Sequence, residues 1–312
     1  MDGRQFVVTG ALGYSGKAIA ERLFERGDRV RTLTNSPRRP NPFGERLEIR
    51  PLAFEDHGAL VESLRGADVL INTYWVRFNH RSFTFAQAVA NTKRLFRAAR
   101  DAGVERIVHV SILHAEGNDD LGYYRGKWEL ERDLKGLGVA YSILRPGVLF
   151  GRGDILVNNI AWTLRRLPLF GVFGDGMYEL EPMHVDDFAA LAVREADANG
   201  NQTVDAKGPE RFAYRELVRT IGEIIGERRP IVRVPLWSGL CVTRMIDPFV
   251  GDRIITREEA IGLMRGILAS DAPPTGSIRL TEWARAHREE LGRRYASEVG
   301  RRVKRDVAYE KV

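Results

Sequence analysis

Hydrophobic and polar positions follow a repeating β-α-β-α pattern along the first half of the chain. Short runs rich in β-branched residues alternate with longer stretches in which apolar residues recur every three to four positions. The predicted strands cover residues 6–8, 30–34, 47–51, 69–72, 107–110 and 141–144. The first predicted helix contains Ile19, Leu23 and Phe24 and ends at Gly27, and the next predicted helices cover 60–64, about 82–101 and 123–134. Repeated units of this kind predict an α/β fold, with a doubly wound parallel sheet of the Rossmann type and helices on both faces.

The pattern changes after about residue 151, where helices dominate. Helices are expected over residues 155–166, 186–196, 214–225, 256–268 and 281–302, with short strands near 183–185, 204–206 and 231–234. We therefore expect a Rossmann domain over residues 1–150 and a smaller, mainly helical, substrate-side region over 151–312. Some segments of that region, about 183–206, are expected to return to the main sheet.

The most apolar long segment is 234–250, which Pro235, Arg244, Asp247 and Pro248 interrupt. It predicts a partly buried helix, with a position on a membrane surface as the alternative. No apolar run approaches the roughly 18–20 residues of a membrane span, and the first residues carry no charged-then-apolar leader. We therefore expect neither a membrane span nor a signal peptide.

Three glycines separate the first strand from the first helix: Gly10, Gly13 and Gly16. Gly10 permits a tight turn, Gly13 lets the backbone approach a diphosphate, and Gly16 lets the helix pack close to the strand. The N-terminus of the following helix would face the phosphates. This strand-turn-helix context predicts a dinucleotide site formed by Thr9, Gly10, Leu12, Gly13, Tyr14, Gly16 and, at the end of another strand, Asn72.

The residues after the second strand favour NADP(H) over NAD(H). An acidic residue usually follows the glycines by about 20 positions where a ribose 2′-hydroxyl is bound. Asn35 lies near that position here, and Arg38 and Arg39 follow it. Arginine side chains suit a 2′-phosphate. The alternative is that both arginines belong to a solvated loop.

Composition and charge narrow the choice of partners and compartment. The chain has 312 residues, 44% of them hydrophobic, and a net charge of +6. Much of the excess lies within 293–305, where acidic residues are interleaved, so a solvated helix face is expected and a nucleic-acid partner is not. The single cysteine, Cys241, indicates a reducing, cytoplasmic location. The six histidines show no metal-ligand spacing, so no metal is expected.

Several motifs occur along the chain in the same order as in the short-chain dehydrogenase/reductase superfamily. The chain resembles the extended or atypical branch of that superfamily, which is NmrA-like and epimerase/dehydratase-like. The resemblance extends over about residues 5–225, and the chain is also similar to the NADPH-binding accessory subunits of respiratory complex I. It implies that Pro146 lies at the cofactor. The matching segments are 9–16, 91–111, Leu144-Arg145-Pro146-Gly147 and Met183-His184-Val185-Asp186-Asp187.

The resemblance also implies a catalytic pair, which Tyr123 and Lys127 supply. Residues four apart lie on one helix face, and a nearby ammonium lowers the pKa of a phenol. Tyr123 could then act as general acid or base, and Lys127 could also hold the nicotinamide ribose. A serine usually completes such a site, often as the second of two. Ser111 takes the first position and Ile112 the second, so either Ser111 or His114 fills the role, or the hydroxyl is missing.

Three further features have two interpretations each. The aromatic segment 74–85 either lines a substrate pocket or forms a packed lid. Asn91 either supports the active site or lies on the surface. Asp186 and Asp187 resemble a catalytic pair, but their place at a helix start favours capping and dipole roles.

Two functions follow from these observations. The first is an NAD(P)-dependent oxidoreductase or epimerase/dehydratase that acts on a small-molecule carbonyl or alcohol, or on a nucleotide sugar. The alternative is a non-catalytic NADP(H)-binding sensor or accessory subunit, associated with a larger complex or a membrane surface. The Tyr123–Lys127 pair favours the enzyme, and Ile112 together with the long helix expected over 281–302 favours the alternative.

Overall fold

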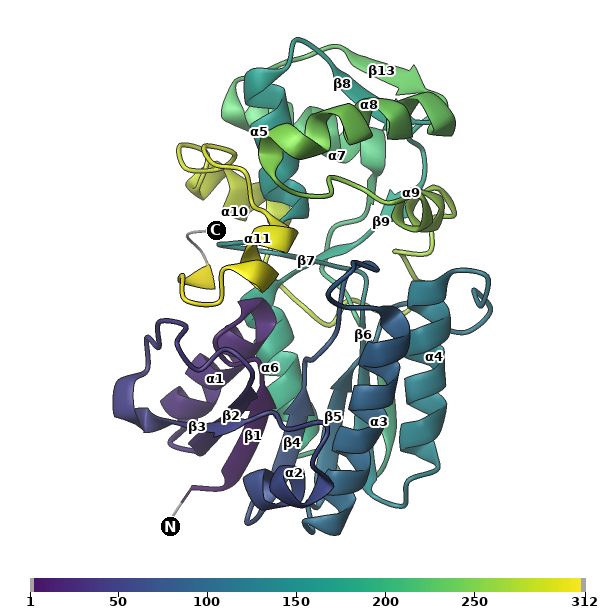
Figure 1. Ribbon diagram of the computed structural model, residues 1–312. Coiled ribbons are helices and arrows are strands. Elements are labelled where there is room, and N and C mark those ends of the chain that lie inside the picture. The colour runs from purple at the N-terminus through teal and green to yellow at the C-terminus, as the bar shows by residue number, and fades with distance from the viewer. Residues whose placement is uncertain (1–2, 310–312) are drawn as a thin grey trace. The chain divides into compact units, whose positions relative to one another are not determined.

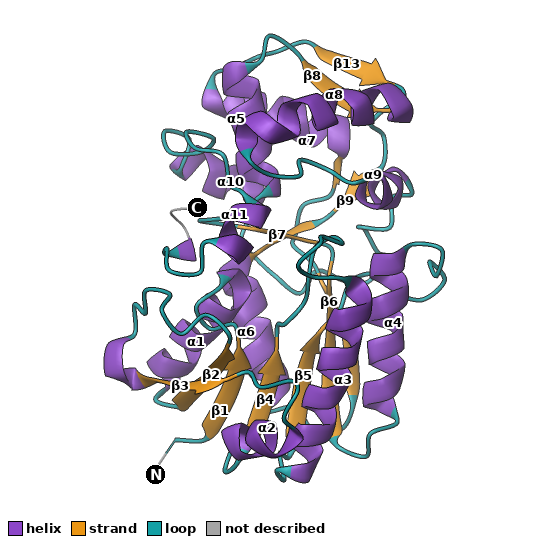
Figure 2. Cartoon of the chain, viewed as in Figure 1, coloured by secondary structure: helices purple, strands orange, loops and turns teal. Residues whose placement is uncertain are grey.

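A computed structural model describes residues 3–309 of the chain (Figures 1 and 2). The chain forms two compact units. The first comprises Met1–Arg145 and Phe188–Asp205, and the second comprises Pro146–Asp187 and Ala206–Val312.

A seven-stranded sheet forms the centre of the first unit, in the order β11-β6-β5-β4-β1-β2-β3. Neighbouring strands from β6 to β3 are all parallel. This is the strand order of a Rossmann sheet, and it confirms the predicted fold class. The strands are β1 (Gln5–Thr9), β2 (Arg29–Thr34), β3 (Leu47–Pro51), β4 (Val69–Asn72), β5 (Arg106–Val110), β6 (Ala140–Pro146) and β11 (Gln202–Ala206).

Helices cover both faces of this sheet (Figure 1). α2, α3 and α4 lie on one face, where Leu64, Phe96 and Leu130 share a core with Leu70 and Ile107 of the strands. α1 and α6 lie on the other face. The helices are α1 (Tyr14–Arg26), α2 (His57–Leu64), α3 (Phe85–Asp101), α4 (Gly122–Lys135) and α6 (Val185–Ala196), with a short 3₁₀ turn, η1 (Gly44–Arg46).

The start of α3 differs slightly from the prediction. The helix begins at Phe85 rather than near residue 82. The side chain of Thr84 accepts a hydrogen bond from Gln87 N and so caps the helix at this point.

The second unit is built around α5 (Leu156–Arg166), α7 (Tyr214–Ile225) and α10 (Leu280–Ala286). Their apolar faces share a core with Phe150 and Leu180. Three pairs of short strands lie in this unit, namely β7 (Val148–Phe150) with β10 (Pro182–His184), β8 (Phe170–Phe173) with β13 (Ile231–Val234), and β9 (Glu179–Leu180) with β12 (Phe212–Ala213). The remaining helices are α8 (Leu236–Val250), α9 (Arg257–Met264) and α11 (Glu298–Val303).

The prediction of one long helix over 281–302 is wrong. α10 ends at Ala286 and α11 begins at Glu298. Between them, Arg165 donates to the carbonyls of Arg288 and Leu291, and Arg166 donates to those of Gly292 and Arg293. These two α5 side chains take carbonyls that a continuous helix would use for its own backbone hydrogen bonds.

The segment 234–250 forms a partly buried helix, as predicted, because seven of the fifteen residues of α8 are exposed and the others are half-buried or buried. Gly239 is the buried residue of α8. Pro235 is its N-cap and Pro248 lies in its last turn, where neither interrupts the helix. No helix within residues 3–309 is long and apolar enough to cross a membrane.

Gly292 is expected to be the critical residue of the turn after α10. Its φ is 73°, and a Cβ there would lie 2.4 Å from the backbone of Ala161 and Trp162. Gly251 has a φ of 61° and no atom within 4 Å of such a Cβ. Gly292→Ala should therefore lower the free energy of unfolding by about 2 kcal/mol or more beyond Gly251→Ala, which carries the backbone strain alone. Urea unfolding of the two variants measures the difference, and equal losses would contradict this packing.

Candidate nucleotide site

The turn between β1 and α1 is closed by contacts that only glycine permits. Gly10 has a φ of 72°, and its carbonyl oxygen accepts a hydrogen bond of 2.8 Å from Gly13 N. A Cβ on Gly16 would lie 2.3 Å from that same carbonyl oxygen. Gly16 therefore lets the first turn of α1 approach the end of β1, as the spacing predicts.

The N-terminus of α1 carries no negative group of its own. Gly13 is the N-cap, no side chain caps it, and the first turn contains no acidic residue. Leu12 is buried beneath this turn, and Tyr14 at the helix start is half-buried. The backbone N–H groups and the positive end of the helix dipole thus suit an anionic ligand such as a diphosphate.

Polar side chains at the carboxyl ends of β1 and β4 hold the turn in place. The Thr9 hydroxyl donates to Asn72 Oδ1 over 3.0 Å and accepts from Thr73 N and Tyr74 N. The Thr73 hydroxyl in turn donates to the Thr9 carbonyl. Thr9 and Asn72, both predicted as cofactor residues, are therefore brought together, and both are buried.

Asn72 also links this network to β5. Its Oδ1 accepts from Tyr74 N, which fixes the amide so that its Nδ2 donates to His109 Nδ1 over 3.1 Å. Complete burial holds the pKa of His109 well below its usual value, and the charge of Lys127 lowers it further. His109 is thus a neutral imidazole that positions Asn72, a role that its place in a buried strand alone does not reveal.

The segment after β2 contains the three residues predicted to select the cofactor. Asn35 and Arg38 are exposed, while Arg39 is buried, and its N–H donates to the Ser36 carbonyl in a tight turn. No acidic residue occurs between β2 and Glu45. Arg38 is therefore the residue of this segment that presents a guanidinium to solvent.

Trp75 contacts both members of the predicted catalytic pair. The Tyr123 ring packs edge-on against the Trp75 ring, with 5.6 Å between the centroids, and against Phe85. Lys127 Nζ lies 4.3 Å from the centre of the Trp75 ring and donates to the Val110 carbonyl over 2.7 Å. The aromatic segment 74–85 thus packs against the predicted catalytic pair.

Lys127 lies in a buried position that disfavours its positively charged form. Its side chain is 2% exposed. Burial lowers the pKa of the ammonium from its ordinary value to about 7, although the negative charge of Glu131 opposes the shift. The group can therefore gain or lose a proton near neutral pH.

The Ser111 hydroxyl contacts a buried ion pair. Its hydroxyl donates to Glu131 Oε1 over 2.5 Å. Glu131 is fully buried and is bound by both Nε and Nη2 of Arg145. Among the hydrogen bonds of the described residues, Ser111 has none to Tyr123 or Lys127. The sequence analysis missed Glu131, although Tyr123, Lys127 and Glu131 are spaced four residues apart on α4.

The other candidate residues differ in their exposure and in their contacts. Ile112 is buried, whereas His114 is exposed and has a φ of 51°. Asn91 is buried and donates to the Tyr74 hydroxyl over 3.2 Å, which supports the aromatic segment. Pro146 is the buried last residue of β6.

Asp186 and Asp187 lie in the first turn of α6, where their negative charges interact favourably with the positive end of the helix dipole. Asp187 has a second role, since it accepts hydrogen bonds from Ser277 N and Ile278 N. This contact anchors the loop before α10.

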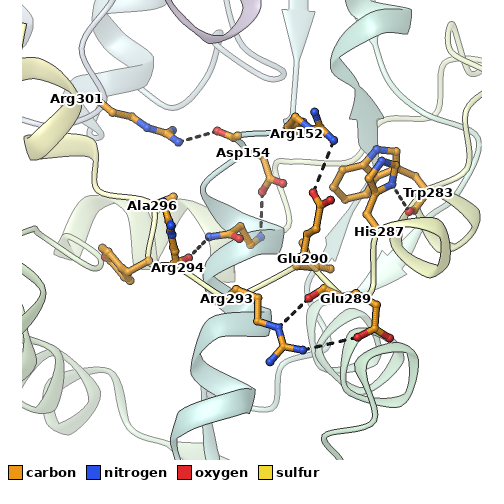
Figure 3. A pocket seen from close by; sticks show the side chains of 15 residues that line it. Arg152, Asp154, Trp283, His287, Glu289, Glu290, Arg293, Arg294, Ala296 and Arg301 are labelled. Atoms are coloured by element: carbon orange, nitrogen blue, oxygen red, sulfur yellow. Dashed lines mark hydrogen bonds and ion pairs between the residues drawn. The ribbon is translucent and has the colours of Figure 1, made fainter. Parts of the chain in front are cut away.

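A separate pocket of ≈ 580 Å³ lies within the second unit (Figure 3). Its charged side chains mostly pair with one another, as in Arg152 with Glu290 and Arg293 with Glu289. Asp154 Oδ1 accepts from the first N–H groups of α5, and burial raises the pKa of this carboxyl to about 7. None of the predicted site residues lines this pocket.

Comparison with known proteins agrees with the glycine turn. Residues 10–156 match the family described as NAD(P)H-binding. Subunit 9 of the NADH dehydrogenase (ubiquinone) alpha subcomplex from Arabidopsis thaliana is 25% identical over 239 residues, 73% of this chain and 60% of that subunit. The chain spans 59% to 64% of the length of the first such subunits that it matches.

A reductase of (4-alkanoyl-5-oxo-2,5-dihydrofuran-3-yl)methyl phosphate from Streptomyces griseus is 27% identical over 232 residues, 72% of this chain and 74% of that enzyme.

Solved structures share the fold at low sequence identity. The triphenylmethane reductase of Citrobacter sp., complexed with NADP(H), has a TM-score of 0.75 at 17% identity over 90% of this chain and 99% of that one. An NADPH-dependent quinone oxidoreductase of Escherichia coli, complexed with NADPH, has a TM-score of 0.68 at 18% identity over 96% of this chain and 98% of that one.

The sequence motifs, the glycine turn and these relatives lead to one conclusion. Residues 10–156 form an NAD(P)H-binding domain, and the chain is similar both to subunits of NADH dehydrogenase (ubiquinone) and to a reductase.

Proposed function

We propose that this protein is an NADP(H)-dependent reductase of a small carbonyl compound. The observation that carries the proposal is the contact of both Tyr123 and Lys127 with Trp75, together with a Lys127 pKa of about 7. A phenol beside an amine of this pKa is suited to proton transfer near neutral pH.

The turn after β1 fits the diphosphate of a dinucleotide. Gly10, Gly13 and Gly16 leave no side chain between the α1 N-terminus and a ligand, and no carboxylate of the first turn competes for that position. When bound there, NADPH supplies hydride chemistry. The chain itself supplies the binding groups and the proton.

Tyr123 is the proposed proton donor to the substrate oxygen. A protonated Lys127 stabilises the phenolate that remains after the proton has moved, because opposite charges a few ångströms apart favour ionisation. The Tyr123 ring packs edge-on against the rings of both Trp75 and Phe85, and these contacts limit its rotation. The Streptomyces griseus reductase among the relatives supports this proposal.

Arg38 is the proposed contact for the 2′-phosphate that distinguishes NADP(H) from NAD(H). It is exposed, and the segment around it lacks an acidic side chain that would bind a ribose hydroxyl.

A second candidate function has its own supporting observation. The Ser111 hydroxyl donates to Glu131, which Arg145 also binds, and Ile112 has no hydroxyl, so neither residue orients a substrate oxygen beside Tyr123. A protein that holds NADP(H) without turnover, as a sensor or as an accessory subunit of a complex, fits this arrangement. The complex I subunits among the relatives support this candidate.

Removal of the Arg38 guanidinium should reduce the preference for NADPH. Arg38→Ala is expected to weaken NADPH binding by about tenfold or more and to leave NADH binding within about twofold, since a lost charge-assisted contact is worth roughly 1.5–3 kcal/mol. Fluorescence titration with both nucleotides measures this change. Arg22→Ala, at another exposed position, is the control. An unchanged ratio of the two affinities would remove Arg38 from the site.

Loss of the Tyr123 hydroxyl should separate turnover from binding. Tyr123→Phe is expected to slow NADPH oxidation with menadione or 4-nitrobenzaldehyde by about 100-fold or more, while the Kd for NADPH stays within about twofold. The variant Tyr124→Phe, which changes the adjacent buried tyrosine, should keep its activity.

The turnover of the wild-type protein should fall as the pH rises through about 7, because the Lys127 ammonium exists below its pKa and is lost above it.

The same assays test the second candidate. Tight NADPH binding without turnover of any carbonyl or quinone acceptor by the wild-type protein would contradict the reductase and support the non-catalytic holder.

A further inference from the structure

Exposed apolar side chains concentrate on one helix of the second unit. Among residues 3–309, eight large hydrophobic residues are exposed, and four of them lie on α8. These four are Trp237 (74% exposed), Val242 (55%), Met245 (73%) and Phe249 (89%). Contiguous apolar surface of this kind usually marks an interaction site.

The exposed residues of α8 lie on one side of the helix. At about 100° per residue, six apolar residues fall within a continuous arc of about 140°. We call this surface the α8 arc, and its members are Trp237, Cys241, Val242, Met245, Pro248 and Phe249.

The opposite side of α8 is fixed to the body of the second unit. Gly239 is buried there, and a Cβ on it would lie 2.4 Å from the Phe173 ring of β8. Figure 1 places α8 beside β8 and β13. The helix is thus held on one side and presents the α8 arc to solvent on the other.

Exposed arginines occur on α8 and in the segments next to it. Residues 228–257 contain six arginines and two acidic residues, Asp247 and Asp252, and this segment is bordered by Glu227, Glu258 and Glu259. Both aspartates are already engaged, since Asp247 pairs with Arg253 over 3.5 Å and Asp252 accepts from Glu298 N and Val299 N. In the part of the chain that the structure describes, the exposed side chains of Arg228, Arg233 and Arg244 form no ion pair.

We propose that the α8 arc docks this protein on the surface of an anionic lipid bilayer. Trp237, Met245 and Phe249 would enter the interface between headgroups and acyl chains, and the unpaired arginines would contact lipid phosphates. An apolar helix face with aromatic residues and flanking arginines has the chemistry of an interfacial helix.

The size of the arc favours a lipid surface over a second copy of the chain. A stable protein interface uses about 20–30 residues on each side. The α8 arc offers six residues, and like charges would meet if two copies of this basic segment were placed face to face.

Cys241 provides a direct test, because it lies inside the arc and is the only cysteine of the chain. We would label it with the fluorophore NBD and add vesicles of phosphatidylcholine with phosphatidylglycerol. The proposal predicts a blue shift of the emission and quenching by nitroxide-labelled lipids. Binding should be weaker by about tenfold or more on vesicles of phosphatidylcholine alone, because their surface carries no net negative charge. High salt should have the same effect, because it screens the contacts between arginines and lipid phosphates.

A pair of unlabelled variants tests the same surface without the fluorophore. Trp237→Ser combined with Phe249→Ser should lower vesicle co-sedimentation by about tenfold or more, since two large apolar groups no longer enter the interface. Val303→Ser is the matched control, because Val303 is 61% exposed on α11. Equal melting temperatures and equal NADPH affinities would show that both proteins are folded.

Two results would overturn the proposal. One is the absence of binding to anionic vesicles by the wild-type protein. If light scattering then finds that the wild-type protein is a dimer and the double variant is a monomer, the α8 arc binds a second copy of the chain instead. The other is unchanged vesicle binding by the double variant. The measurement does not depend on turnover, so its outcome is separate from that of the reductase assays.

Discussion

The close approach of Gly16 to the Gly10 carbonyl is the contact on which the nucleotide site depends. It brings the N-terminus of α1 to the carboxyl end of β1, where four backbone N–H groups of a helix start have no intrahelical partner. A side chain on Gly16 would meet that carbonyl at 2.3 Å and force the helix away. The network of Thr9, Asn72 and His109 then holds the neighbouring strand ends in register around the turn.

Two buried polar arrangements on α4 give the site its chemical character. Lys127 lies against the Trp75 ring and donates to the Val110 carbonyl, and its burial lowers its pKa to about 7 although the charge of Glu131 opposes the shift. One turn further along, Glu131 is fully satisfied by Arg145 and Ser111. The first arrangement leaves a proton free to move near neutral pH, whereas in the second the Ser111 hydroxyl and the Arg145 guanidinium satisfy the buried Glu131 carboxylate.

Local features of the sequence predicted most of the first unit. The glycine spacing, the buried β-branched runs and the helix ends depend on neighbouring residues, so β3 and β4 have the predicted bounds and the turn has the predicted contacts. The errors come from distant contacts. Arg165 and Arg166 break the predicted helix over 281–302 from more than 120 residues away, and the partner of Ser111 on α4 became evident only in the folded chain. The apolar content of 234–250 indicated a helix, but not that its apolar side is exposed.

Hydrogen exchange at the glycine turn tests the central claim most directly. If the N-terminus of α1 binds the diphosphate of NADPH, the amides of residues 10–17 will exchange far more slowly when the nucleotide is added, while the amides of α8 will be unaffected. Exchange at residues 10–17 that is the same with and without saturating NADPH would contradict the account.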